Sequence, residues 1–162
     1  MSTINANILK VTQLQHTNGT VAMNIDSSGR VLKPTQPAFA ARGAEANATL
    51  TNGGDLPFNN AFLNVGGHFN TTTYRFTCPV TGVYVFGVNL FANGGVGRMS
   101  LKVNGTAYQN WQSQWEGAAG QWSASTIWKL NANDYVTVGD WQSISGATPY
   151  MGHSHFTGYL LG

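Results

Sequence analysis

The chain has 162 residues, of which only 9% are charged, whereas 42% are hydrophobic and 12% are aromatic. This apolar content can fill a core and excludes a disordered chain, although the charged fraction lies far below the average of about 25%. A surface of Asn, Gln, Thr, Ser and Gly is typical of subunits that bury much of their outside against neighbours.

The charges and the single cysteine exclude several classes of protein. Net charge is +2 and no two Lys or Arg residues are adjacent, so the chain lacks the basic stripe that nucleic acid requires. Cys78 alone cannot make an intrachain disulfide. Residues 1–10 have no basic start or long apolar run, and nothing approaches the ~20 apolar residues that span a bilayer. We therefore expect a protein made in a cytoplasm and not secreted by the ordinary route, with no nucleic-acid or membrane partner.

Residues 1–35 contain no aromatic side chain and predict an N-terminal attachment arm, followed by one domain over residues 36–162. Alternation between residues 8 and 14 predicts a strand, and turns at residues 16–20 and 26–29 separate it from two shorter strands. Three short strands bury too little to fold alone, so the arm is expected to lie on another protein. The side chains expected to anchor it to that partner are Ile8, Leu9, Val11, Leu14, Val21, Met23, Ile25 and Val31.

The rest of the chain predicts an all-β fold. Short segments of β-branched and aromatic residues alternate with Gly, Asn and Pro turns, and no stretch keeps a helical period for three turns. This spacing predicts a β-sandwich or jelly roll. The strands are expected at residues 74–76, 82–91, 99–103, 123–130, 135–138 and 153–161.

Between residues 58 and 88 a set of residues recurs at fixed spacing, namely Phe58, Asn64, Phe69, Phe76, Gly82, Tyr84 and Phe86. This spacing resembles the signature of the complement C1q globular-head family. Residues 37–39 resemble the opening strand of that family, and Val88 departs from its pattern because Phe or Tyr is usual there. The resemblance implies a C1q/TNF-like jelly roll of ten strands over residues 37–162 and a compact homotrimer around an apolar axis, with a mass of about 52 kDa. The signature and closing-strand positions, expected to form the family core, are Phe58, Asn64, Phe69, Phe76, Gly82, Tyr84, Phe86, Phe156, Gly158 and Tyr159.

The N-terminal arm is similar to the opening of small virion proteins from marine tailed bacteriophages. The similarity lies in a Lys-Val-Thr-x-Leu-Gln-His stretch, a turn, residues 24–31 and a following proline. Exposed backbone edges in such an arm suit β-addition to another subunit. The similarity therefore implies that the arm attaches to a particle.

Metal and catalytic sites are weakly indicated. His153 and His155 stand two apart in a predicted strand and would face the same side, where they could share a metal or serve as structural groups; His16 and His68 lie elsewhere. Cys78 is expected to be a buried apolar residue. The carboxylates are Asp26, Glu45, Asp55, Glu116, Asp134 and Asp140, and none has a recognisable acid–base setting; Asp55 or Asp140 could serve calcium. We expect no enzyme activity, no cofactor and no resident metal.

An aromatic loop leaves two interpretations open. Trp platforms ringed by Gln and Asn are typical of carbohydrate sites, whereas the same rings could fill the core or the trimer seam. The residues that could contact a glycan or line the seam are Tyr108, Trp111, Trp115 and Trp122.

Two functions follow from these observations. In the first, the protein is a non-enzymatic capsid decoration or cement protein, a homotrimer bound to the major capsid protein or another virion subunit through its arm. In the second, the same trimer is the receptor-binding tip of a phage tail or head fibre and grips a host surface glycan. The short arm favours the first and the Trp-rich loop favours the second.

Overall fold

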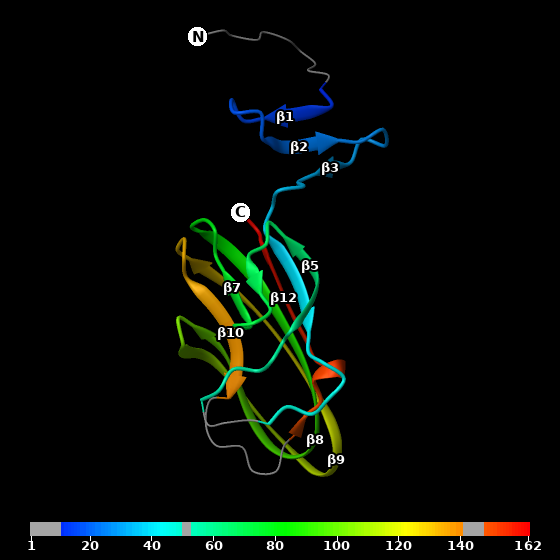
Figure 1. Cartoon of the computed structure of the whole chain (residues 1–162), viewed down its shortest axis with the longest axis vertical. Helices are drawn as coiled ribbons and strands as arrows, with labels where there is room; N and C mark the ends of the chain where they lie inside the picture. Colours follow the sequence, from blue (N-terminus) through cyan, green and yellow to red (C-terminus); the bar gives the residue numbers. More distant parts are fainter. Residues whose placement is uncertain (1–10, 50–52, 141–147) are drawn as a thin grey trace. The chain divides into compact units, whose positions relative to one another are not determined.

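The computed structural model describes residues 11–49, 53–140 and 148–162, with the side chains of residues 94–98, 109, 111–118 and 140 outside the description. The chain divides into two units, Met1–Gln36 and Pro37–Gly162 (Figure 1). Within the described residues, no helix is long and apolar enough to cross a membrane.

The N-terminal unit is a small antiparallel sheet of β1 (Gln13–Gln15), β2 (Val21–Ile25) and β3 (Val31–Leu32), in that order. The predicted turns both form. Gly19 adopts a φ of 85°, and its N–H donates to the His16 carbonyl. In the second turn the Asp26 carboxylate accepts hydrogen bonds from the Ser28 and Arg30 N–H groups and from Arg30 Nε at 2.7 Å. Local side-chain bonds therefore fix the register of this sheet.

The larger unit is built from strands with a single short 3₁₀ helix among its described residues. The early strands are β4 (Ala38–Arg42), β5 (Asn60–Val65), β6 (Phe69–Asn70) and β7 (Arg75–Thr77). Two long strands follow, β8 (Gly82–Val103) and β9 (Thr106–Leu130). The chain closes with β10 (Tyr135–Asp140), β11 (Thr148–Pro149), η1 (Met151–His153) and β12 (His155–Leu160).

Strands β8 and β9 run the length of this unit and join two layers (Figure 1). The first half of β8 pairs with β12 and with the second half of β9. The second half of β8 pairs with β10 and with the first half of β9. One layer, called the β12 layer, thus has the order β5–β4–β12–β8–β9, and the other, the β10 layer, has the order β6–β7–β10–β8–β9. This arrangement confirms the predicted all-β sandwich.

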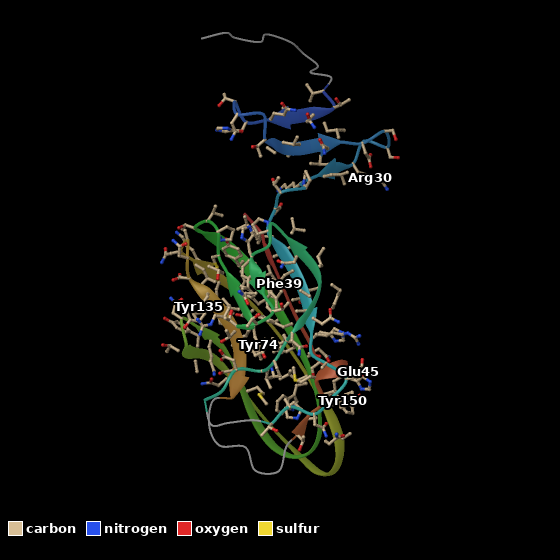
Figure 2. All side chains as sticks on the ribbon, viewed as in Figure 1. Arg30, Phe39, Glu45, Tyr74, Tyr135 and Tyr150 are labelled. Atoms are coloured by element: carbon tan, nitrogen blue, oxygen red, sulfur yellow. The ribbon has the colours of Figure 1, made fainter. Side chains whose placement is uncertain are left out.

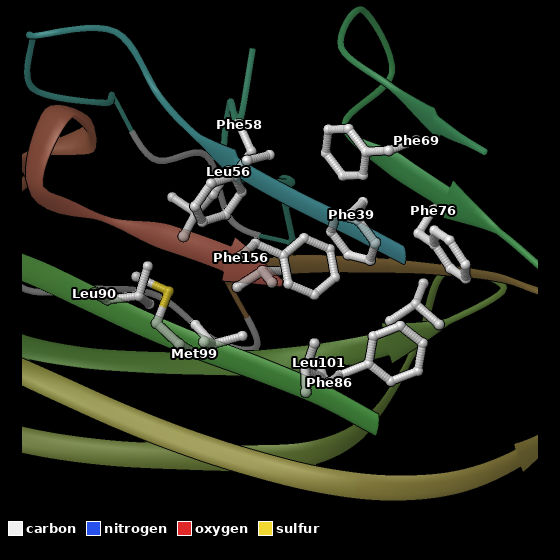
Figure 3. Close-up of a cluster of buried hydrophobic side chains, with 14 of the residues drawn as sticks. Phe39, Leu56, Phe58, Phe69, Phe76, Phe86, Leu90, Met99, Leu101 and Phe156 are labelled. Carbon is white, nitrogen blue, oxygen red and sulfur yellow. The ribbon is translucent and has the colours of Figure 1, made fainter. Parts of the chain in front are cut away.

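Aromatic rings from both layers form the core (Figure 3). Phe39 of β4 is central, with ring centroids 4.7 Å from Phe69, 4.8 Å from Phe76 and 4.8 Å from Phe156. Gly158 of β12 makes this packing possible, because a Cβ there would stand 2.6 Å from the rings of Phe39 and Phe86. The glycine is thus required by close approach of neighbouring rings.

Several predicted strand limits were wrong. Residues 82–91 and 99–103 belong to one strand, because β8 continues through its glycine-rich middle with only a register shift against β9. The predicted strand 123–130 is the end of β9, which begins at Thr106. The last strand begins at His155 rather than at residue 153, since residues 151–153 form η1.

Candidate interaction surfaces

The outer face of the β12 layer carries an apolar row that crosses the strands. Strand alternation turns Phe86 and Phe156 inward and their neighbours outward. The outward residues pair across the layer in one continuous row, Ile127, Val85, Tyr159, Ala38 and Val65. Ile127 is 62% exposed and Tyr159 is 47% exposed. A row of this kind, open to solvent on one chain, is a candidate contact surface.

The next row on this face is small and uncharged. It comprises Ser125, Gly87, Thr157, Ala40 and Leu63. Because Gly87 has no side chain, a shallow depression of about 220 Å³ opens beside it, and His155 and Asn89 stand at its margin. The Thr157 hydroxyl donates to the Gly87 carbonyl at 3.2 Å and so satisfies the backbone there.

Polar groups on the rest of this face bond to one another. The Asn89 amide donates to Ser123 Oγ at 2.9 Å and accepts from Gln121 Nε2 at 2.8 Å. Among the rows that cross the face, the charged side chains are Lys129 and Arg42, at opposite ends. The outer face of the β12 layer can therefore be covered without burying a charge in its middle.

The N-terminal sheet also presents an apolar face. Leu14 pairs with Met23, Ile25 pairs with Val31, and Val21 alternates with Met23, so all these residues point the same way. Leu14, Ile25 and Val31 are exposed. Ile8 and Leu9 lie outside the described residues, and Val11 is half-buried.

Most signature positions lie in the core, and the exceptions are Asn64, Gly82 and Tyr159. Phe58, Phe69, Phe76, Tyr84, Phe86 and Phe156 are buried. Asn64 is exposed and instead braces the backbone, donating to the Phe69 carbonyl at 2.8 Å and accepting from its N–H at 3.0 Å. Tyr159 is not a core residue, because alternation along β12 turns it outward. Gly82 contacts the end of the chain, where a Cβ would meet Leu160 at 2.6 Å.

The two C-terminal histidines do not share a face. His153 lies in η1, with its ring 5.3 Å from Phe91 and 4.8 Å from Tyr150. His155 begins β12 and contacts Phe62 at 6.3 Å. The shared-metal interpretation failed because residue 153 is not in a strand. No group of three or more His, Cys, Asp or Glu side chains that could hold a metal ion occurs in the described part of the chain.

Each described carboxylate has a structural partner. Asp26 pairs with Arg30. Glu45 pairs with Arg42 at 2.6 Å and accepts from the Tyr150 hydroxyl (Figure 2). Each of these partners is a cation, a hydroxyl or an amide, so none of the contacts joins two of the described carboxylates. Glu116 and Asp140 have side chains outside the description.

Asp55 is tied to a buried lysine that sequence reasoning missed. Lys102 is 4% exposed, and its Nζ donates to Asp55 Oδ1 at 3.0 Å and to the carbonyls of Gly53 and Gly54. The Thr137 hydroxyl donates to the same carboxylate oxygen. An ammonium group thus occupies the place that calcium would need.

Cys78 is buried, as expected. Burial, and to a lesser degree the charge of Asp134, raises the pKa of the Cys78 thiol to about 12. A neutral thiol is a poor nucleophile and a poor metal ligand. Cys78 therefore acts as a core residue.

The four aromatic residues predicted to contact a glycan or line the trimer seam do not form one group in the described part of the structure. Trp122 packs partly buried against the core. Trp111 and Trp115 have side chains outside the description. Tyr108 is 67% exposed and lines a pocket of about 330 Å³ with Trp128, a residue that sequence reasoning did not select. No sequence signal joins them, because twenty positions of β9 separate the two rings.

Comparison with known proteins identifies the family of the larger unit. Residues 38–161 match the C1q domain. Rat complement C1q tumor necrosis factor-related protein 5 is 41% identical over 56 residues, which are 35% of this chain and 23% of that protein. Mouse complement C1q and tumor necrosis factor-related protein 9 is 26% identical over 113 residues, 65% of this chain and 33% of that protein. The matched stretch is thus a third or less of these relatives.

Solved structures share the fold. The globular domain of zebrafish complement 1qA protein aligns with a TM-score of 0.64 at 20% identity, covering 78% of this chain and 98% of that one. Murine APRIL aligns with a TM-score of 0.62 at 10% identity, covering 78% and 99%. C1q domains are generally non-enzymatic, and C1q/TNF folds typically form homotrimers. The predicted C1q/TNF-like jelly roll is confirmed, and the chain belongs to the C1q domain family.

Proposed function

We propose that the protein is a non-enzymatic structural subunit, a homotrimer that attaches to a larger particle through its N-terminal sheet and decorates the surface of that particle. The particle we propose is the head of a tailed bacteriophage, with the major capsid protein or another virion subunit as the partner. The observation that carries the assembly is the outer face of the β12 layer, which is partly apolar and has no charge in its middle.

The trimer is proposed because apolar side chains on the outer face of the β12 layer are exposed in a single chain. Ile127, Tyr159 and Leu63 are 62%, 47% and 46% exposed in one chain. A second and third copy of the chain can cover these side chains by repeating one contact around an axis. The absence of charge between Lys129 and Arg42 removes the main desolvation cost of that contact.

Attachment is assigned to the N-terminal sheet because its apolar face is exposed and its strands are short. Leu14, Ile25 and Val31 present aliphatic side chains on one side, and β1 is an edge strand of the sheet that the described residues form. A partner strand added along that edge would complete the backbone pairing. The resemblance of residues 24–31 to phage virion proteins supports a capsid as that partner.

Two measurements test the proposal. Light scattering of the purified chain should give about 52 kDa, three times 17.3 kDa, and a stable monomer would overturn the assembly. Deletion of residues 1–33 should leave a soluble trimer that no longer co-sediments with particles of the virus that encodes it. If the shortened chain still decorates, the jelly roll carries attachment and the assignment of roles is wrong.

A receptor-binding tip is the second candidate, and the pocket at Tyr108 and Trp128 favours it. Copy number separates the two functions. A decoration protein is expected in numbers comparable with the major capsid protein, whereas a fibre tip is expected as a small fraction of it. The measurement is quantitative mass spectrometry of purified particles.

A further inference from the structure

The pocket beside Tyr108 lies between the two ends of β9, which come together because the middle of this strand passes from one layer to the other. Tyr108 lies near the start of β9, in the β10 layer, and Trp128 lies near its end, in the β12 layer. Their ring centroids are 6.2 Å apart and their planes meet at 64°. Trp128 is held in place on its other side by Phe86 at 6.1 Å. The two rings thus form adjacent walls of one cavity of about 330 Å³.

Two turns locked together form the polar side of this pocket. Val103 pairs with Thr106 across an Asn104-Gly105 turn in which both φ angles are positive, at 52° and 80°. The Asn104 amide donates to Asp134 Oδ1 at 2.8 Å and accepts from the Tyr135 N–H at 3.0 Å. The β8–β9 turn therefore holds the β9–β10 turn in a fixed position.

Asp134 is an ionised acceptor with capacity left over. The Asn104 amide, and after it the Asn131 N–H at 2.8 Å, lowers the pKa of the Asp134 carboxyl. Each carboxylate oxygen receives one of these bonds, and each has a second lone pair. A hydroxyl-bearing ligand can therefore donate to Asp134 without displacing an existing bond.

The lining determines the class of ligand. Its two charges, Lys129 and Asp134, are of opposite sign, so the site suits a ligand without net charge. Lys129 can donate and Asp134 can accept, while Val103 and Leu130 supply apolar surface. A pyranose ring combines hydroxyl groups at its rim with an apolar C–H face that packs on aromatic rings. A volume of about 330 Å³ is near the lower limit of ligand pockets and fits one small ring system.

We propose that the cavity lined by Tyr108, Trp128, Asn131 and Asp134 binds a neutral hexopyranose unit of a glycan. The Tyr108 ring packs on the apolar face of the sugar, and the Asp134 carboxylate accepts hydrogen bonds from the sugar hydroxyls. Tyr108 and Asp134 belong to neither row of that outer face, although Lys129, at one end of the face, also lines the cavity. The sugar site goes beyond the decoration role.

The test is saturation-transfer NMR on the full chain with methyl pyranosides of glucose, galactose, mannose and N-acetylglucosamine. At least one sugar should show transfer to its ring protons. Tyr108→Ala should raise the dissociation constant of that sugar about tenfold, because one aromatic wall of the pocket is lost. Tyr108→Phe should retain binding, since the ring remains. Tyr74→Ala, which removes an aromatic ring outside the pocket, is the control and should bind as the wild type does.

Four results would overturn the proposal. One is no transfer to any of the four sugars. The second is equal binding by the wild type and Tyr108→Ala. The third is dissociation of the trimer by Tyr108→Ala, because the pocket would then be covered by a neighbouring copy. Light scattering of the wild type reports on the trimer separately, so failure of the sugar site and failure of the assembly are distinguishable. Choline chloride serves as a charged probe, and its binding in place of the sugars is the fourth result against a glycan.

Discussion

Placing a charge in the apolar row should dissociate the protein without unfolding it. Ile127→Glu changes a side chain that is 62% exposed in the single chain. Surface substitutions of this kind alter folding stability by only about 0.5 kcal/mol or less. In the proposed trimer the same position is covered, so the substitution buries three carboxylates.

The size of the effect follows from the exposure. Full burial of an Ile side chain contributes about 1.5–3 kcal/mol. The 62% that is still exposed therefore leaves about 1–2 kcal/mol per subunit to be gained on assembly. Three subunits lose about 3–6 kcal/mol, which raises the trimer dissociation constant by about 10²–10⁴. Burying an unpaired carboxylate costs several further kcal/mol per subunit, so the trimer dissociation constant rises still more.

The assay is sedimentation velocity across a range of micromolar concentrations, with thermal unfolding followed in parallel by circular dichroism. Ile127→Glu should sediment as a monomer where the wild type is a trimer. Its circular dichroism spectrum should stay that of a β-sheet protein.

Val80→Glu is the matched control. Val80 is another exposed aliphatic residue, 47% exposed in the turn before β8, and its backbone carbonyl rather than its side chain accepts the Tyr84 hydroxyl at 2.7 Å. It lies away from the apolar row and should leave the trimer intact. A trimeric Ile127→Glu protein, or equal dissociation by both variants, would refute the assignment of the outer face of the β12 layer.

Three further predictions concern the domain itself. Gly158→Ala should lower the free energy of unfolding by about 1–3 kcal/mol, because a Cβ there would stand 2.6 Å from two core rings. Urea unfolding measures this loss, and wild-type stability would contradict the packing. Lys102→Met should lower the free energy of unfolding by about 2–4 kcal/mol, because the half-buried Asp55 loses its ion pair. An unchanged free energy of unfolding would show that the ion pair contributes nothing. The thiol of Cys78, with a pKa raised to about 12 from 9.0, should resist iodoacetamide at pH 8 until the chain unfolds. The folded state binds this proton more tightly, so its contribution to stability is complete below pH 9 and is lost as pH rises toward 12.

The short-range features of the chain could be predicted from the sequence. The turn at residues 16–20 depends on an Asn-Gly pair and the turn at residues 26–29 depends on the Asp26 side chain, so both are local. The inward aromatics of β8 follow from strict alternation. These features need no knowledge of the rest of the molecule.

The long strands and the pocket could not be predicted in this way. The glycines in the middle of β8 interrupt the hydrophobic pattern, yet pairing with β9 carries the strand through them. The tertiary pairing overrides the weak local preference. Tyr108 and Trp128 meet only because β9 crosses between layers, and no spacing rule in one sequence records that crossing. The Lys102 ion pair depends in the same way on a loop almost fifty positions away.

The family resemblance and the proposed function are carried by opposite faces of the same strands. In β12, Phe156 and Gly158 point inward and determine the fold, whereas Thr157 and Tyr159 point outward and contact whatever covers the layer. A signature of inward residues therefore identifies the jelly roll without identifying its partner. A chain that kept the signature but carried charges at positions 85, 127 and 159 should fold as a C1q domain and yet not assemble through this face. We therefore expect the outward residues of β8, β9 and β12 to decide what this chain assembles with.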